Sequence, residues 1–362
     1  MTIERDAIQQ ALSKVQDPAT GRDLRAGQLT GVELDGGRVK LAVDLISPGY
    51  PRLDELEAAI RGALAGIAGV DEVVIDYGLK VPTKPARQDL NRLPTVKNII
   101  AVAAGKGGVG KSTISVNTAM ALHRLGAKVG ILDADIYGPS VPKMLGKAER
   151  ETSTTADGKR IAPALYRGLT VMSVAYFVEP GQAVVWRGPM IHKLLKQFLE
   201  DVAWGELDYL IVDLPPGTGD AQLSLAQLIP ITGAVIVTTP QEVALIDVRR
   251  AVSMFNKLEV PLLGVVENMS YYACPACGHH DNIFSSGGGK SLAKELNVEL
   301  LGQVPIDNRI SYGAEVGVPV VEGAPDSEYA SALTSIAANA AMAVSTLSAT
   351  GPKRSSMLRT LS

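Results

Sequence analysis

Short, uninterrupted apolar runs recur along most of the chain, separated by stretches in which apolar residues have helical spacing. Continuous apolar runs, unlike strict alternation, are typical of strands that are covered on both faces. Strands that alternate with amphipathic helices predict an α/β fold, with a mostly parallel sheet and helices on both of its faces. The expected strands are residues 98–104, 128–133, 169–175, 208–213, 233–239, 262–267 and 300–304.

Residues 1–80 have a different pattern and predict a small α+β domain that precedes this sheet. Apolar residues alternate with polar ones on both sides of Asp35-Gly36-Gly37, which is a hairpin signal. Helices are expected at residues 3–15 and 53–67, and a last short strand at residues 70–75.

The proline content and the polar stretches predict where the remaining boundaries fall. Residues 81–97 contain three prolines and mixed charges, and we expect a linker there. The large domain then spans residues 98–348 and includes a polar surface excursion at 146–167. An Ala-rich helix is expected at 329–347, and residues 349–362 are expected to be disordered.

A glycine-rich loop between the first long apolar run and a helical stretch carries the clearest chemical signal. Its residues are Gly105, Lys106, Gly107, Gly108, Val109, Gly110, Lys111 and Ser112, followed by Thr113. This pattern in a strand–loop–helix context is typical of a P-loop, whose backbone N–H groups surround phosphate oxygens. Lys111 would reach the β- and γ-phosphates of ATP, and the Ser112 hydroxyl would bind Mg²⁺. The alternative is a tight glycine turn without a ligand.

Acidic residues end two of the other expected strands. Asp213 closes an apolar run in a Walker B pattern and would hold Mg²⁺ through its water shell. The stiff turn 214–220 follows it and is a candidate switch. Asp133 and Asp135 leave a neighbouring strand, where two carboxylates can hold Mg²⁺ or orient an attacking water. Arg187 could contact phosphate, a partner or only the surface. A solvated turn is the alternative for the acid pair.

Cys274 and Cys277, the two cysteines of the chain, form a C-x-x-C motif. Three interpretations compete. The first is a redox pair, but such a pair would more often start a helix in a thioredoxin-like unit, a context that this stretch lacks. Zinc could be bound by both thiolates with His279 or His280. An iron–sulfur cluster needs about four thiolates, which a symmetric dimer would supply.

Charge, apolar run length and cysteine count limit the classes of partner and location that remain. A net charge of −3 gives no global basic field for nucleic acid. No apolar run in the sequence has the length of a membrane span, and the N-terminus is polar. Because two cysteines do not make a disulfide framework, we expect a cytoplasmic protein with reduced thiols.

The motifs occur together and in order: K-G-G-V-G-K-S, D-A-D, V-D-L-P-P-G-T-G-D, V-E-N-M-S and C-P-A-C. Together they resemble the Mrp/ApbC family of P-loop iron–sulfur carrier ATPases, which share a deviant Walker A motif with the ParA/MinD proteins. The resemblance implies a homodimer that carries a labile [4Fe–4S] cluster on paired C-P-x-C loops and transfers it to apo iron–sulfur proteins.

The resemblance also implies roles for single residues. Lys106 would reach the nucleotide of the partner subunit. Asp135 would lie near the hydrolytic water and Asp133 on the Mg²⁺ side. Asn268 would bond the adenine edge, which Pro305 would border.

The N-terminal domain resembles a module of cluster-assembly systems. Relatives often carry a cysteine in its Thr-Pro-x-Cys-Pro turn, where this chain has Tyr50 in residues 47–51. We therefore expect a docking or stabilising module without thiol chemistry.

Three functions remain open on the sequence. The first is a cluster-carrying ATPase. The second is a MinD- or ParA-like positioning ATPase, although the tail 353–359 is only faintly like a basic amphipathic helix. The third is a zinc-stabilised NTPase scaffold. The sequence leaves [4Fe–4S], [2Fe–2S] and zinc undecided.

Overall fold

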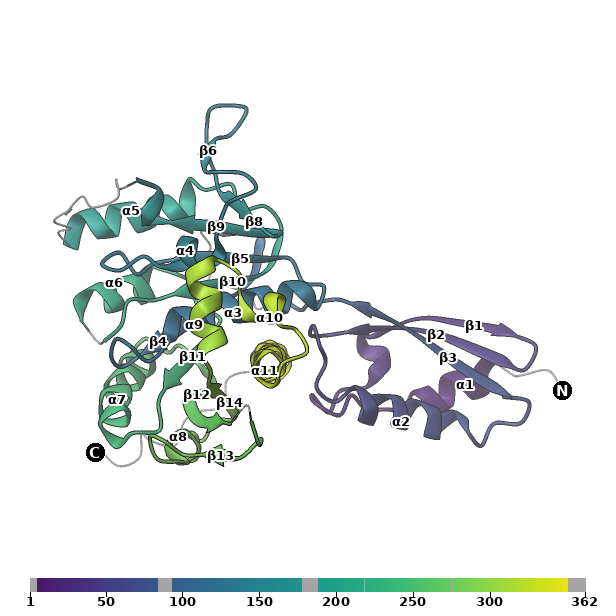
Figure 1. Ribbon diagram of the computed structural model, residues 1–362. Helices are drawn as coiled ribbons and strands as arrows, with labels where there is room; N and C mark the ends of the chain where they lie inside the picture. The colour runs from purple at the N-terminus through teal and green to yellow at the C-terminus, as the bar shows by residue number, and fades with distance from the viewer. Residues whose placement is uncertain (1–4, 84–92, 178–187, 218, 275, 351–362) are drawn as a thin grey trace. The chain divides into compact units, whose positions relative to one another are not determined.

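The computed structural model describes residues 5–83, 93–177, 188–217, 219–274 and 276–350 (Figure 1). Contacts divide the described chain into two units, each with its own hydrophobic core. The N-terminal unit contains residues 5–82 together with 341–350. The P-loop unit contains the described residues from 83 to 340.

The described part of the N-terminal unit has a three-stranded sheet in the order β1-β2-β3. β1 and β2 form the expected antiparallel hairpin, and β3 pairs with β2 in parallel through the helical crossover α2. Leu56, Ile60 and Leu64 recur at helical spacing on α2 and are fully buried. The elements are α1 (Arg5–Leu12), the 3₁₀ helix η1 (Leu24–Ala26), β1 (Leu29–Asp35), β2 (Arg38–Leu45), α2 (Leu53–Leu64) and β3 (Glu72–Leu79).

Tyr50, at the position where the resembling modules often have a cysteine, lies inside this core. It is 4% exposed, and its hydroxyl donates to Asp17 Oδ2 over 2.7 Å. Gln28 Nε2 donates to the same oxygen over 3.0 Å, while the Thr20 amide and hydroxyl donate to Asp17 Oδ1. Tyr50 is therefore one donor in a buried network that satisfies a carboxylate, which agrees with a structural module.

The P-loop unit is built on a nine-stranded sheet in the order β13-β12-β11-β4-β10-β5-β9-β8, with β14 paired to β12. All pairings are parallel except those of β8 and β13, which are antiparallel. The strands are β4 (Val96–Ala104), β5 (Val129–Asp133), β8 (Ala164–Tyr166), β9 (Leu169–Ser173), β10 (Leu207–Asp213), β11 (Gly233–Thr238), β12 (Leu262–Ala273), β13 (His280–Asp281) and β14 (Leu300–Ile306). The seven strands predicted from apolar runs are all present.

Helices cover both faces of this sheet, as predicted (Figure 1). One face packs against α5 (Gly188–Glu200), α6 (Asp220–Leu228), α7 (Glu242–Lys257) and α8 (Gly288–Leu296) in a single core. The other side holds α3 (Lys111–Arg124), α4 (Val141–Leu145), α9 (Asn308–Val316), α10 (Val320–Gly323) and the first part of α11 (Glu328–Thr350). The fold class expected from the sequence is therefore confirmed.

Several boundaries differ from the predictions. The stretch 146–167, expected to be a polar surface excursion without strands, contains β6 (Ser153–Thr154), β7 (Ile161–Ala162) and the edge strand β8. The end of the expected linker belongs to the sheet, since Leu93 is buried and β4 begins at Val96. Residues 349 and 350 are still helical, whereas 351–362 and most of the linker lie outside the described residues.

The long helix α11 also differs from the expectation that no segment has membrane-spanning length. Residues Glu328–Ala349, with a mean hydropathy of 1.3 over the most apolar window, are long and apolar enough to cross a membrane. Core helices pass the same test. Leu333, Ile336 and Ala337 are 0–1% exposed, and the Asn339 side chain donates to the Leu301 carbonyl of β14.

Replacing Tyr50 with phenylalanine is expected to destabilise the N-terminal unit by about 1–3 kcal/mol, because a buried carboxylate loses a donor. Amide exchange of peptides from residues 15–50, in the full-length chain, measures the effect. Tyr77→Phe is the matched control: its hydroxyl is 3.4 Å from Glu57 in a partly exposed site, and little change is expected. Equal losses in the two variants would contradict this account.

Acidification should weaken the same unit. Burial raises the pKa of Asp17, but hydrogen bonds from Tyr50, Gln28 and Thr20 outweigh it, so the net pKa lies below its usual value. A carboxyl group with a lowered pKa in the folded state contributes stability above its unfolded pKa and loses it as the pH falls through the folded value. Urea unfolding between pH 6 and pH 3 should therefore show a smaller loss in Asp17→Asn than in the wild type.

Candidate nucleotide and thiol sites

The P-loop joins the end of β4 to the start of α3, and its glycines are required by geometry. Gly108 and Gly110 have φ of 79° and 83°, which are left-handed values. A Cβ on Gly105 would lie 2.4 Å from the backbone of α7 at Asp247 and Val248. Around these residues, Gly107 is exposed, Val109 is buried, and Lys106 and Thr113 are partly exposed.

Lys111 and Ser112 converge on the buried carboxylate of Asp213. Lys111 Nζ lies 2.8 Å from Asp213 Oδ2, and its side chain is 6% exposed. Ser112 Oγ donates to the same oxygen over 2.6 Å. Ser115 Oγ, one helical turn further on, donates to Asp213 Oδ1 over 2.6 Å. The parallel register of β4 and β10, which pairs Val102 with Asp213, carries this carboxylate to the loop.

The two acids that follow β5 lie in different surroundings. Asp133 is fully buried, and its Oδ2 accepts from Ser173 Oγ over 3.0 Å and from the Val141 amide over 3.3 Å. Burial and the neighbouring Asp213 raise the pKa of Asp133 to about 7. Asp135 is closer to the loop lysine, 3.6 Å from Lys111 Nζ. Burial also raises the pKa of Asp135, against the opposing effect of Lys111.

Asn268 contacts the P-loop itself. Its Nδ2 donates to the Val109 carbonyl over 2.8 Å, and its side chain is buried. The amide nitrogen therefore holds the loop, and the adenine contact expected for Asn268 stays a prediction. Pro305 follows Val304, the residue that pairs with Asn268 across β12 and β14.

Lys106 is the lysine of the P-loop that was expected to act across a dimer interface. In the described ranges no carboxylate lies within ion-pair distance of its side chain, and its reach toward a partner subunit stays a prediction. Arg187, and Thr218 within the expected switch 214–220, lie outside the described residues.

The thiol pair lies at the tip of a hairpin between β12 and β13. Tyr272 pairs with Asp281 and Ala273 with His280, and the Cys274 amide donates to the His279 carbonyl over 2.9 Å. Cys274 is partly exposed and Cys277 is exposed. Hydrogen bonds from the amides of Ala276 and Cys277 lower the pKa of the Cys274 thiol. Amides directed at a sulfur favour a thiolate, which is the form that binds metals.

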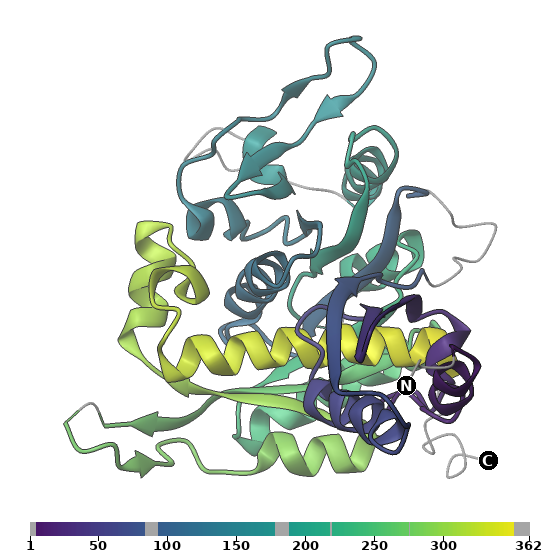
Figure 2. The same ribbon diagram turned by 90° about the vertical axis from the view of Figure 1, so that its right-hand side faces the viewer.

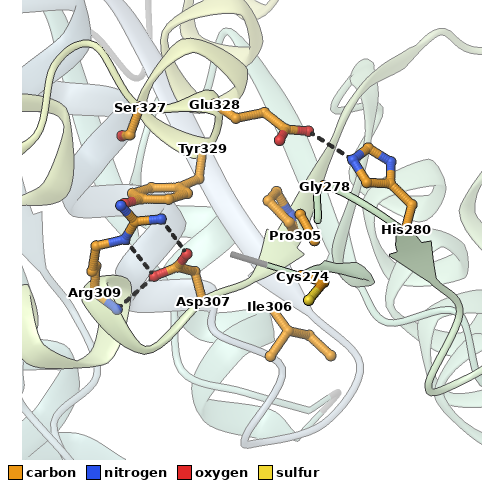
Figure 3. Close-up of a pocket in the computed structure, with 11 residues that line it drawn as sticks. Cys274, Gly278, His280, Pro305, Ile306, Asp307, Arg309, Ser327, Glu328 and Tyr329 are labelled. Carbon is orange, nitrogen blue, oxygen red and sulfur yellow. Dashed lines mark hydrogen bonds and ion pairs between the residues drawn. The ribbon is translucent and has the colours of Figure 1, made fainter. Parts of the chain in front are cut away.

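A cavity of about 250 Å³ opens beside Cys274 (Figure 3). Pro305 and Ile306 line it together with Arg309, whose guanidinium lies 4.6 Å from the centre of the Tyr329 ring. Pro305 therefore borders the thiol side of the sheet edge, which the sequence did not predict. His280 lies 3.7 Å from Glu328 at the rim of this cavity.

The described side chains do not bring a complete metal site together within one chain. Among the residues that the structure describes, no group of three or more His, Cys, Asp and Glu side chains is placed to hold a metal ion. Cys274 and Cys277 form no such group with His279 or His280 among the described residues, and zinc stays one of the alternatives that the sequence left open.

Comparison with known proteins agrees with this pair of sites. The family model described as NUBPL iron-transfer P-loop NTPase matches residues 95–341. The chain belongs to this family. A second model, described as iron–sulfur cluster assembly protein, matches residues 5–75 of this NUBPL-family protein. Both matches confirm the family expected from the motifs.

Relatives of this NUBPL-family protein include the iron–sulfur cluster carrier protein of Deinococcus radiodurans, 48% identical over 92% of this chain and 93% of that one. The iron–sulfur cluster carrier protein of Synechocystis is 44% identical over 95% and 98% of the two chains. An ADP-bound nucleotide-binding protein from Archaeoglobus fulgidus matches with a TM-score of 0.56 and 38% identity, over 64% of this chain and 92% of that one. The cell division ATPase MinD of Pyrococcus furiosus shares the fold, with a TM-score of 0.51 at 24% identity over 67% of this chain and 97% of that one.

Sequence reasoning missed some of the polar residues that complete the nucleotide site of this NUBPL-family protein. Ser115 has a signal in the sequence, because it lies three residues after Ser112 and so on the same face of α3. Ser173, which donates to Asp133, has no signal beyond its position at the end of β9. Its partner is known only once the order of the strands is known.

Gly110→Ala is expected to weaken ATP binding at least tenfold. A Cβ there would lie 2.2 Å from Asn268 Nδ2, in addition to the cost of a left-handed alanine. Gly126→Ala is the matched control, since Gly126 has φ of 94° and open space around it. That variant should lose only about 1–2 kcal/mol of stability and keep its ATP affinity. Titration with a fluorescent ATP analogue measures both, and equal affinities would refute the predicted clash.

Proposed function

We propose that the protein is an ATP-hydrolysing iron–sulfur cluster carrier that acts as a homodimer. Two chains would each contribute Cys274 and Cys277 to one labile cluster, which is the cargo passed to apo iron–sulfur proteins. The observation that carries the proposal is the exposed thiol pair. Its amides favour a thiolate, and the described side chains around it offer no third ligand.

The number of ligands that a cluster needs supports a site made by two chains. An iron–sulfur cluster is held by about four protein ligands, and the chain has two cysteines. A two-fold axis beside the hairpin would bring four thiolates together without any further residue. The relatives named iron–sulfur cluster carrier proteins support the cargo. We propose [4Fe–4S] as its type, a cluster that four thiolates can hold.

For the nucleotide, the chain offers a site that fits Mg²⁺ and ATP. Ser112 Oγ and Asp213 Oδ2, 2.6 Å apart, are hard oxygen donors of the kind that Mg²⁺ prefers. When bound, Mg²⁺ would neutralise charge on the phosphate oxygens. Lys111 would bind the β- and γ-phosphates, and the P-loop amides would hold the other phosphate oxygens.

Hydrolysis needs a group that orients water near the γ-phosphate. Asp135, 3.6 Å from Lys111 Nζ, is the acid that fits this role. Asp133 is fully buried and pairs with Asp213 in the register of β5 and β10, so its proposed part on the Mg²⁺ side is to support Asp213 rather than to contact the ion. Lys106 would act at the nucleotide of the partner subunit.

Two remaining assignments follow from the same proposal. A thiol pair that must stay reduced between transfers fits a cytoplasmic location. Neither nucleic acid nor a membrane is needed as a partner, because the cargo is held by thiolates and the recipients are proteins.

Cys274→Ala is expected to abolish cluster binding after anaerobic reconstitution with iron and sulfide, because two chains would then supply only two thiolates. Absorbance near 400 nm, iron and sulfide analysis and native mass spectrometry measure cluster content and subunit number. His279→Ala and His280→Ala are the controls and should keep the cluster. Loss of metal in either histidine variant, or a cluster retained by a monomer, would refute the shared site.

A further inference from the structure

One strand, β12, carries both the contact to the P-loop and the thiol pair. Its first part, Leu262–Glu267, lies in the sheet interior and pairs with β11 in parallel. Asn268 then contacts the P-loop, and Cys274 follows directly after the last strand residue, Ala273. Figure 2 shows this strand and its hairpin extending from the sheet at the lower left. The two sites are therefore connected by a short piece of a single strand.

The contact between Asn268 and the P-loop is buried and closely packed. Asn268 is 6% exposed, and its Nδ2 donates to Val109 between two glycines in left-handed conformations. A methyl group on Gly110 would lie 2.2 Å from the same nitrogen. A displacement of the Val109 carbonyl when phosphates enter the loop would therefore either break this bond or move Asn268.

The same strand is also held by a partly buried polar network around Glu267. Ser270 Oγ and Gln303 Nε2 donate to Glu267 Oε1 over 2.5 and 2.7 Å, and the Gly289 amide donates to Oε2. Gln303 Nε2 also lies 2.8 Å from Ser270 Oγ. The network ties β12 to β14 and to the start of α8.

β12 bends directly after Asn268. Met269 has φ of 55°, and the register with β14 shifts between Asn268 and Tyr272. The bonds of Glu267 hold the strand before this bend, and the bonded Ser270 hydroxyl holds it just after. A shift of Asn268 is therefore either taken up at Met269 or passed along the strand toward the hairpin.

We propose that Asn268 is a positioning residue through which phosphate in the P-loop changes the geometry of the Cys274/Cys277 hairpin within one chain. This deepens the proposed function by naming how the nucleotide acts on the cargo site. The coupling is intramolecular and does not require that two subunits change their angle.

The thiols themselves report on the coupling, since the chain has only two cysteines. The experiment measures the rate of maleimide labelling of the metal-free, reduced, full-length protein. The probe is inorganic tripolyphosphate with Mg²⁺, which fills a P-loop but has no adenine, so any contact of Asn268 with the base is excluded. Calorimetry sets a saturating concentration for each variant.

In the wild type, tripolyphosphate should change the labelling rate by about fivefold or more, the lower end of typical coupling between sites. Asn268→Ala should bind tripolyphosphate but lose this response. Asn339→Ala is the matched control, because it removes a similar bond of 2.9 Å, from an asparagine amide to the carbonyl of Leu301 on β14, and should keep the response. Lys111→Ala should show none.

A wild type whose labelling ignores saturating tripolyphosphate would overturn the proposal, and so would an Asn268→Ala variant that responds as the wild type does. If Asn268→Ala fails to fold, Gln303→Ala replaces it. That variant removes two bonds of the Glu267 network from a side chain at the surface, and its response should fall at least twofold. An unchanged response would overturn the proposal.

The two proposals fail separately. Labelling is measured without a cluster, so its outcome does not depend on which metal the thiols hold. Conversely, reconstitution of Cys274→Ala tests the cluster site whether or not phosphate acts on the hairpin.

Discussion

The ion pair of Lys111 with Asp213 is the interaction on which the nucleotide site depends. Asp213 is fully buried, and its two oxygens are engaged by Lys111, Ser112 and Ser115 from the first turns of α3. Removing one partner of such a pair costs about 3–5 kcal/mol, because the other charge is left buried and uncompensated. The pair therefore fixes α3 against β10, and with it the P-loop, whose amides are proposed to bind the phosphates.

The thiol site follows the opposite physical rule. Cys277 is exposed and Cys274 is partly exposed, whereas Lys111 and Asp213 of the nucleotide site are buried. A catalytic charge gains strength from burial, but a cargo that must leave needs an open site and ligands that a recipient can replace. The sheet satisfies both demands because β12 passes from the interior at Asn268 to the surface at Ala273.

Sequence reasoning succeeded where one local pattern decided the outcome. The buried parallel strands were predicted because their apolar runs are continuous, and the hairpin of the N-terminal unit because Gly36 and Gly37 interrupt an alternation. It failed at the edges. β8 and β13 are three and two residues long and antiparallel, too short for a period to be visible. β12 extends beyond residue 267 because pairing with β13 and β14 overrides its polar composition.

The sequence by itself determined the chemistry: a P-loop, acids at strand ends and one thiol pair, each carried by residues close together along the chain. Only the tertiary structure decided how these residues share partners. It directs Asn268 at the loop carbonyl, buries Asp133 beside Asp213 on the neighbouring strand, and brings Ser115 to the Asp213 carboxylate. The physical reason is that such bonds join residues far apart in sequence, and the order and register of the strands set which of them meet.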